Sequence, residues 1–301
     1  MLDVRKLRLL RELAHRGTIA AVAEALAYTA SAVSQQLTAL EREAGVPLLE
    51  RTGRRVVLTP AALTLVEHTE TILAVLEQAA ADLAASRAAL TGTLRIGAFP
   101  SAVRTILSPA LVALSRDHPG LELLVTELDP STVPAALRAA TLDVALVHEY
   151  DYVPAEPDPA IDTEPLFEET VYLAALTGGP LRDRRDASWI VGTPGTLCHT
   201  MTVRACQAAG FTPRVRHHAD DFGTVLALVA AGQGVALIPE LGVLAPPPEV
   251  VLTALPTRRR THLAYRRGTA AHPAVSAART ALRTHAGQPT APGASASSWG
   301  R

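Results

Sequence analysis

Residues 17–59 read GTIAAVAEALAYTASAVSQQLTALEREAGVPLLERTGRRVVLT, and this stretch decides the fold of the N-terminal part of the chain. Its first part predicts a short helix over 19–26, because the Thr18 hydroxyl can accept a hydrogen bond from the free amides of a first helical turn. A second helix is expected over about 29–44, where Gly45 supplies a C-cap. The pattern therefore predicts two short helices joined by a tight turn.

The second helix has one apolar and one polar face. Val33, Leu37 and Leu40 fall at positions i, i+4 and i+7 and predict a buried stripe. The opposite face is formed by Ser34, Gln35, Thr38 and Arg42. Short hydrogen-bonding side chains of this kind suit a helix in a DNA major groove. An amphipathic helix pair in any helical domain is the alternative, but Glu and Lys would be more typical of a solvated face.

A basic turn follows the second helix. Arg51 precedes Gly53, which permits a tight turn, and a strand-like segment is expected over 56–58. Arginines at such a turn can reach flanking phosphates. The residues predicted to contact DNA are Thr29, Ala30, Ser31, Ser34, Gln35, Thr38, Arg51, Arg54 and Arg55.

Four motifs carry a resemblance to a known family: AVSQQL over 32–37, LE over 40–41, GVPLLERTGR over 45–54 and LTPA over 58–61. Together they resemble the winged helix-turn-helix of LysR-type transcriptional regulators, without a gap over about sixty residues. The chain departs from the family pattern at three places. Ala30-Ser31 stand where a proline is common, Leu49 replaces a usual Phe, and Ala62 replaces a frequent Gly.

Composition places limits on the class of protein. The 301 residues carry a formal net charge of −1, and 48% of them are hydrophobic but only 4% aromatic. Residues 1–60 hold nine Lys and Arg against six Asp and Glu, so a basic module is joined to a slightly acidic body. No apolar run of membrane-spanning length, no secretion signal and only two cysteines occur, which predicts a cytoplasmic protein without a disulfide framework.

Two helical segments flank the motif. A first helix is expected over 3–16, with Arg8, Arg11 and Arg16 on a solvated or phosphate-facing side. Another begins at Pro60, after the N-cap Thr59, and continues without Gly or Pro to Leu90. Its apolar and small residues recur by threes and fours as a heptad seam of about 45 Å. The resemblance implies that this segment is a dimerisation and linker helix. A single long helix packed on its own domain is the alternative.

The remaining chain alternates between strands and helices. Strands are expected over 94–99, 121–127 and 142–147 with helices between them, and the pattern repeats after 165, which predicts parallel sheets covered by helices. Two crossovers, over 150–165 and after Val250, would join two α/β lobes. Such lobes resemble periplasmic-type solute-binding domains, in which the ligand lies in the cleft between lobes.

The expected fold class is thus an α/β multidomain protein: an N-terminal winged helix-turn-helix, a long linker helix and a two-lobed α/β effector-binding domain. The predicted boundaries are 1–59 for the DNA-binding domain, 60–91 for the linker helix, 92–286 for the effector-binding domain and 287–301 for a disordered tail. Within the effector-binding domain, lobe I comprises about 92–160 and 250–286, and lobe II about 161–249.

Loops at the strand ends predict the effector site. Ser101 is expected to cap the helix after the first strand, which would favour an anion there, although an ordinary N-cap explains it equally. His148 is expected either to hydrogen-bond an effector or to be solvated at the crossover, whose acidity disfavours an anion. The residues predicted to contact the effector are Phe99, Pro100, Ser101, Ala102, Leu128, His148, Thr193, Gly195, Thr196 and Phe222.

Other chemistry is less well supported by the sequence. Cys198 and Cys206 lie eight positions apart, and a redox-sensing regulator is an alternative because the peroxide-sensing branch of the resembled family has a reactive pair in this region. Adjacent His217 and His218 on a strand point apart, so no metal site is expected there. We expect no cofactor and, in the absence of catalytic motifs, no enzymatic activity.

The predicted function is a sequence-specific regulator that binds double-stranded DNA at a pseudo-palindromic operator as a homodimer or homotetramer, and whose operator binding or activation a small-molecule effector modulates. Two alternatives remain: a nucleoid-type DNA binder without an effector, and an α/β enzyme or solute carrier with dimerising helices. The effector, the target genes and the direction of regulation are left open by the sequence.

Overall fold

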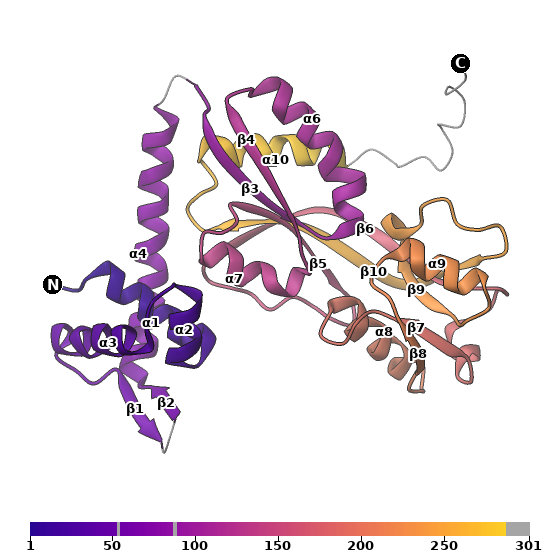
Figure 1. Cartoon of the computed structure of the whole chain (residues 1–301), viewed down its shortest axis with the longest axis horizontal. Helices are drawn as coiled ribbons and strands as arrows, with labels where there is room; N and C mark the ends of the chain where they lie inside the picture. Colours follow the sequence, from indigo (N-terminus) through magenta and orange to yellow (C-terminus); the bar gives the residue numbers. More distant parts are fainter. Residues whose placement is uncertain (53–54, 87–88, 287–301) are drawn as a thin grey trace. The chain divides into compact units, whose positions relative to one another are not determined.

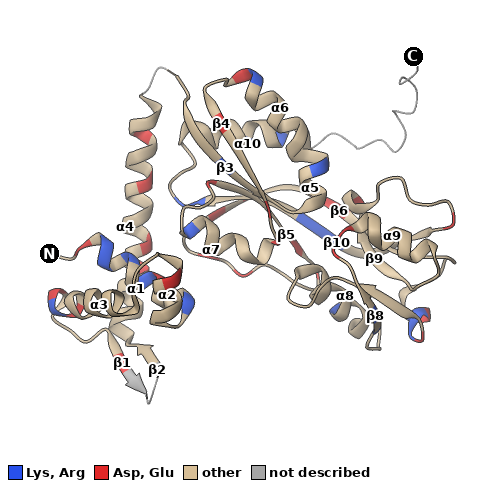
Figure 2. Ribbon diagram, viewed as in Figure 1, with Lys and Arg blue, Asp and Glu red and all other residues tan. Residues whose placement is uncertain are grey.

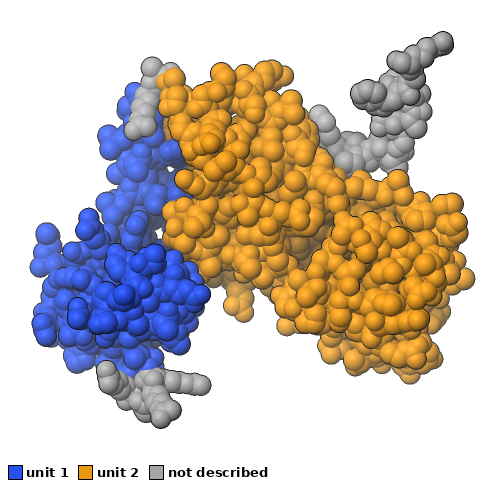
Figure 3. Space-filling view, in the orientation of Figure 1, with its two compact units in different colours: residues 1–87, 266–272 blue, residues 88–265, 273–301 orange. Residues whose placement is uncertain are grey.

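The computed structural model describes residues 1–52, 55–86 and 89–286 (Figure 1). The chain divides into two compact units, Met1–Arg87 with Arg266–His272, and Ala88–Tyr265 with Pro273–Arg301 (Figure 3). Arg54 and the tail 287–301, two subjects of sequence-based predictions, lie outside the described residues, as do the side chains of Arg51 and Arg55. Each unit has its own hydrophobic core.

The first unit is a winged helix-turn-helix followed by a long helix, as predicted. Its elements are α1 (Val4–Arg16), α2 (Ile19–Ala25), α3 (Ala30–Ala44), β1 (Leu49–Thr52), β2 (Arg55–Leu58) and α4 (Pro60–Ala85). The predicted stripe of Val33, Leu37 and Leu40 is fully buried, and it packs in the same core as Leu10 and Val22.

Local capping residues set the helix ends. The hydroxyls of Thr18 and Thr29 accept hydrogen bonds from the amides of Ala21 and Ala32, at 3.2 and 3.1 Å. Gly45 ends α3 with φ of 71°, a left-handed conformation that glycine adopts without the strain of a Cβ. The sequence signals for these ends are therefore confirmed by the geometry.

The prediction that α1 exposes all its arginines was wrong. Arg11 is buried, and its guanidinium donates to Glu12 at 2.8 Å and lies 3.7 Å from the Glu70 carboxylate on α4. Arg16 pairs with the other oxygen of Glu12 at 2.8 Å. Because Glu70 is distant in sequence, the pattern within α1 alone could not reveal this buried ion-pair network.

The basic turn connects two antiparallel strands. β1 pairs with β2 in a register that places Leu49 opposite Leu58 and Thr52 opposite Arg55. Only the second of these strands was predicted. The following helix, α4, begins at Pro60 as expected but ends at Ala85, short of the predicted Leu90.

A six-stranded mixed sheet forms the frame of the second unit, in the order β4-β3-β5-β10-β6-β9, and a separate two-stranded parallel sheet pairs β7 with β8. β3 runs parallel to both β4 and β5, as the βαβ pattern predicted. The elements of the first lobe are β3 (Gly92–Ala98), α5 (Pro100–Ala102), a π-helical turn (Val103–Leu107), α6 (Ser108–Asp117), β4 (Leu121–Glu127), α7 (Val133–Arg138), β5 (Val144–Tyr150) and α10 (Pro273–Ala286). Those of the second are β7 (Ser188–Val191), α8 (Leu197–Ala208), β8 (Arg214–His218), α9 (Phe222–Ala230) and β9 (Ala236–Pro239).

Two long strands connect the lobes. β6 (Ile161–Ala175) and β10 (Val251–Arg266) each run through both lobes, so the sheet is continuous between them. The first crossover was predicted over 150–165, before a strand over 171–176, and the second, after Val250, as strands over 250–255 and 262–265. The structure corrects both predictions: a single extended strand makes each connection, with β10 antiparallel to β5 and β6 antiparallel to β9.

A glycine between α9 and β9 allows a close backbone approach. A Cβ at Gly234 would lie 2.6 Å from the carbonyl oxygen of Ser188 and 3.0 Å from its carbon. We expect Gly234→Ala to lower the free energy of unfolding by about 1–3 kcal/mol, because the crowded atoms belong to backbone that cannot rotate away. Gly178→Ala is the matched control, since its Cβ would meet only Val251, at 3.7 Å. Equal urea midpoints for the two variants would contradict this account.

Candidate functional site

The exposed surface of α3 carries most of the predicted DNA contacts. Ser31, Gln35 and Thr38 are exposed and Ser34 is half-buried, while the opposite face fills the core. Among the described residues, none of these four side chains has a hydrogen-bonding partner, so their polar atoms are available to a ligand. The Thr29 hydroxyl is already engaged as the α3 cap.

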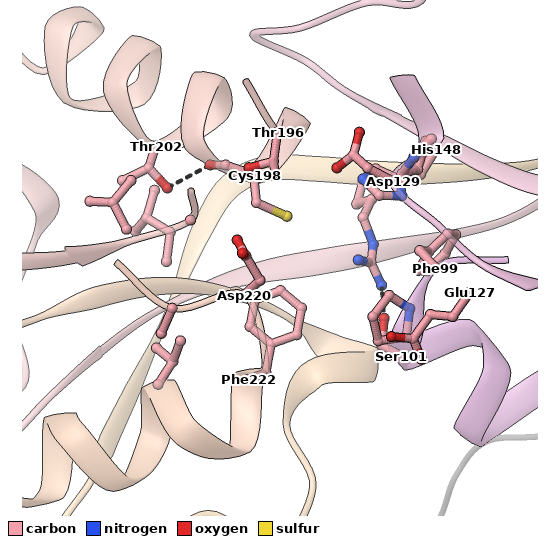
Figure 4. Close-up of a pocket in the computed structure, with 18 of the residues that line it drawn as sticks. Phe99, Ser101, Glu127, Asp129, His148, Thr196, Cys198, Thr202, Asp220 and Phe222 are labelled. Carbon is pink, nitrogen blue, oxygen red and sulfur yellow. Dashed lines mark hydrogen bonds between the residues drawn. The ribbon is translucent and has the colours of Figure 1, made fainter. Parts of the chain in front are cut away.

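A cavity of about 240 Å³ lies between the lobes of the second unit (Figure 4). Its apolar wall comes from both lobes and includes Phe99 after β3 and Phe222 at the start of α9, with Ile190, Val191, Val225 and Leu237. The carboxyl ends of β3, β4 and β5 meet here with the loop that follows β7. Ligands of two-lobed α/β folds bind at the carboxyl ends of strands in this way.

The structure brings seven of the ten predicted effector residues to this cavity: Phe99, Pro100, Ser101, Leu128, His148, Thr196 and Phe222. The other three are not among its lining. Ala102 is fully buried, and Gly195 is exposed with φ of 98°. Thr193 instead positions a lining residue, because its amide and hydroxyl donate to the carboxylate of Asp220 at 2.8 and 2.6 Å.

The predicted role of Ser101 as an N-cap was wrong. The N-cap position belongs to Phe99, which makes no side-chain capping bond, and the first helical segment is only three residues long. The Ser101 hydroxyl is buried and accepts a hydrogen bond from the guanidinium of Arg259 at 3.2 Å. This helix end is therefore not a preformed anion-binding site.

Arg259 on β10 is the main lining residue that the sequence reasoning missed; the arginines at 258–260 are coloured blue on that strand in Figure 2. Its side chain is 1% exposed and forms an ion pair with Glu169 of β6 at 2.6 Å. The guanidinium also lies over the Phe99 ring, 4.8 Å from its centroid. Burial alone would lower the pKa of Arg259, but the charge of Glu169 and the hydrogen bond to it keep that pKa raised, so the guanidinium stays charged.

A pattern in the sequence points to this residue. Leu255, Thr257, Arg259, Thr261 and Leu263 alternate along β10, and all five are buried. Because strand residues two apart share a face, the apolar ends of this series place the middle arginine inside.

His148 is buried, not solvated as one of the two predictions for it supposed. It lies between Phe99 and Tyr150, with ring centroids 4.5 and 5.1 Å away in edge-on geometry. Burial, and then the nearby charge of Arg259, holds the pKa of His148 well below its usual value, so its imidazole is neutral. Neither ring nitrogen has a hydrogen-bonding partner in the described chain, although both are buried.

Carboxylates are the other ionisable groups at the cavity. Glu127 ends β4, Asp129 follows it, and Asp220 lies opposite them on the second lobe. Beside the cavity, Arg104 of the first lobe forms an ion pair with Asp221 of the second at 3.0 Å. Asp221 also caps α9 by accepting from the Thr224 amide at 2.9 Å, so this exposed pair links the helix end to the opposite lobe.

The two cysteines lie on α8. The Cys198 thiol is in the cavity wall, 3.4 Å from the Tyr150 hydroxyl, whereas Cys206 is in the core of the second lobe. Burial raises the pKa of Cys198, and it raises that of Cys206 to about 12. Eight residues of helix separate the sulfur-bearing positions by about 12 Å along the axis, too far for a disulfide without unwinding α8.

We expect both thiols to be protonated at pH 7 and to react slowly with iodoacetamide, since the thiolate is the nucleophile. Alkylation should accelerate only as the pH rises above about 9, towards these raised pKa values. Mass spectrometry of peptides after timed alkylation measures the rate, with urea-unfolded protein as the control. Rapid labelling of folded Cys198 at pH 7 would refute this expectation.

No group of three or more His, Cys, Asp or Glu side chains gathers as a metal site in the described parts of the chain. At the end of β8, the Nδ1–H of His218 donates a hydrogen bond to the Gly192 carbonyl at 3.1 Å. Within the same residues, every helix is too short or too polar to cross a membrane.

Fold and cavity together define a helix-turn-helix module joined to a two-lobed ligand-binding module. Residues 4–63 match the family model described as a bacterial regulatory helix-turn-helix protein of the lysR family, and residues 87–287 match the LysR substrate binding domain. This chain belongs to the LysR family of transcriptional regulators.

Individual relatives agree with the family match. The probable hydrogen peroxide-inducible genes activator of Mycobacterium avium is 30% identical over 246 residues, which cover 79% of this chain and 78% of the relative. The transcriptional dual regulator GltC of Bacillus subtilis is 29% identical over 248 residues, 79% of this chain and 81% of that one. Among solved structures, a C206 mutant of Corynebacterium glutamicum OxyR is 25% identical, with a TM-score of 0.54 over 95% of this chain and 92% of that one.

Proposed function

We propose that this regulator reads operator DNA through α3 and that a small molecule bound between its lobes changes that binding. The presence in one chain of an exposed polar recognition face and an interlobe cavity with unpartnered polar groups carries the proposal. The two sites are then coupled: occupancy of the cavity alters affinity for DNA, and DNA alters affinity for the effector by the same factor.

Contacts to bases are assigned to Ser31, Ser34 and Gln35, and Thr38 lies on the same face. Serine and glutamine side chains hydrogen-bond base edges in the major groove, glutamine in two-point fashion to adenine. Arg51, Arg54 and Arg55 of the turn between β1 and β2 are assigned to phosphates, which hold the protein in register without reading sequence.

We infer a dimer formed through α4. Val75, Leu76 and Leu83 are 63%, 47% and 74% exposed on this helix in the single chain. Large apolar groups along one helix indicate a surface that another copy covers. A two-fold dimer would present two α3 helices to a pseudo-palindromic operator. The division into DNA-binding (1–59), linker (60–91) and effector-binding (92–286) parts, a cytoplasmic location and the lack of catalytic activity belong to the same proposal.

Thiol-based sensing is the second candidate. The name of the mycobacterial relative supports it, and so does the position of Cys198 in the cavity wall. The raised pKa of that thiol and the separation of the two cysteines along α8 oppose it. We therefore favour reversible binding of a small molecule over oxidation as the input signal.

The test is capture of genomic DNA fragments by the purified full chain at near-physiological salt, read by sequencing. A sharp pseudo-palindromic site is expected, especially upstream of its own gene or a divergent one. Diffuse capture over the genome would replace the proposal with a nucleoid-type binder. Failure to capture any DNA would leave only a ligand-binding or enzymatic role for the chain.

A further inference from the structure

We infer that the effector is a small organic cation, an amine or guanidine carried on an apolar body, held by the carboxylates that face the interlobe cavity and by His148. This inference rests on the proposed function of that cavity as the effector site, and it names the chemical class of the ligand.

The charges of the cavity wall favour a cation. Glu127, Asp129 and Asp220 bring three carboxylates to it, and Arg259 is its single guanidinium among the described residues. That guanidinium is paired with Glu169 at 2.6 Å, so the ion pair presents no net positive charge to an incoming anion. A carboxylate ligand would enter beside three like charges, whereas an ammonium would be attracted by all three.

The carboxylates also keep hydrogen-bonding capacity for a donor. Within the described part of the chain, the Glu127 carboxylate has no partner, and the Asp129 carboxylate accepts only from the Ser131 amide, at 2.9 Å. Asp220 is held in place by the amide and hydroxyl of Thr193, one on each oxygen, which leaves a lone pair on both oxygens. A fixed carboxylate with free lone pairs suits a ligand that donates hydrogen bonds, as ammonium and guanidinium groups do.

His148 is an independent sign that a ligand completes this site. It is 5% exposed and lines the cavity, yet both of its ring nitrogens lack a partner. Buried polar groups are ordinarily hydrogen-bonded, and an unmet one costs about 1–3 kcal/mol. A neutral imidazole offers one acceptor nitrogen, which an ammonium N–H can satisfy, and one N–H, which any acceptor on the ligand can satisfy. His148 therefore indicates a polar ligand, and the carboxylates of the wall decide the sign of its charge.

The size and lining of the cavity define the rest of the ligand. A cavity of about 150 Å³ lined by apolar side chains holds benzene. The volume of about 240 Å³ found here therefore accommodates one ring and a short aminoalkyl chain. Phe99 and Phe222 lie on opposite sides of the cavity and provide the apolar contact for such a ring.

The experiment is calorimetric titration of the full chain with three phenyl probes of similar size: 2-phenylethylamine, phenylacetate and 2-phenylethanol. We expect the amine to bind with a Kd at least tenfold lower than either of the others. Asp220→Asn, which keeps an acceptor for Thr193 but removes the charge, should raise the amine Kd about tenfold. Asp117→Asn is the control, because Asp117 is exposed and pairs only with its neighbour Arg116.

Tighter binding of the carboxylate, equal binding of amine and alcohol, or no binding of any probe would overturn the inference. A gel-shift titration on a captured DNA fragment then separates it from the proposed function. Amine binding that leaves DNA affinity unchanged retains the ligand class and refutes the coupling. A response of DNA binding to carboxylates alone retains the coupling and refutes the ligand class.

Discussion

Replacing Arg259 by alanine is expected to lower the free energy of unfolding of the effector-binding module by about 3–5 kcal/mol, because it leaves the Glu169 carboxylate buried without its cation. Glu169 is 3% exposed, and its other oxygen accepts from the Leu241 amide, at 2.6 Å. The loss should lower the urea midpoint of unfolding of the full chain, which circular dichroism measures.

The neighbouring arginine provides a matched control for this variant. Arg258 faces away from the cavity, is 41% exposed and lies 3.5 Å from Glu168. Exposed pairs contribute about 0–1 kcal/mol, so Arg258→Ala should have a small effect. The double variant Arg259→Met, Glu169→Gln should recover most of the loss, since it removes both charges and keeps an acceptor for Leu241. Similar losses at the two arginines would show that Arg259 is not the buried charge described here.

The second large effect is expected on DNA recognition. Gln35→Ala should weaken binding to the operator by about 1–3 kcal/mol, or 5- to 150-fold, and should leave binding to random DNA nearly unchanged. The reason is that a two-point contact to a base edge is lost while the phosphate contacts remain. Fluorescence anisotropy with captured and scrambled duplexes at fixed salt measures both affinities.

Two other variants complete that comparison. Gln36→Ala is the matched control, because Gln36 is also exposed but lies outside the face formed by Ser34, Gln35 and Thr38. Arg54→Ala should weaken binding to both duplexes alike and reduce the salt slope by about one. An equal loss on operator and random DNA for Gln35→Ala would remove this residue from base reading.

The helix-turn-helix was predictable because its signals are local. The caps at Thr18, Thr29 and Gly45 and the stripe of Val33, Leu37 and Leu40 each depend on residues within one or two helical turns. The two-lobed fold was predictable for a similar reason, since apolar strands alternate with helices along the chain. The positions of Phe99 and His148 at the ends of strands then placed them at the cavity.

What the sequence did not reveal depends on contacts between distant segments. The buried state of Arg11 requires Glu70, and that of Arg259 requires Glu169, so each charge looks like a surface residue when it is read alone. The Ser101 hydroxyl was assigned to a helix cap because its real donor comes from a strand 158 positions away. β1 is four residues long and mostly polar, and only its pairing with β2 makes it a strand.

The central claim is that a dimer of this chain reads DNA by inserting two copies of α3 into the major groove. Dimethyl sulfate footprinting of the wild-type chain on a captured fragment tests it most directly, because it reports guanine N7 in the major groove. The account predicts two protected major-groove segments with their centres one helical turn, about 34–36 Å, or a multiple of it, apart. Uniform protection along the fragment, or protection of a single isolated segment, would contradict it.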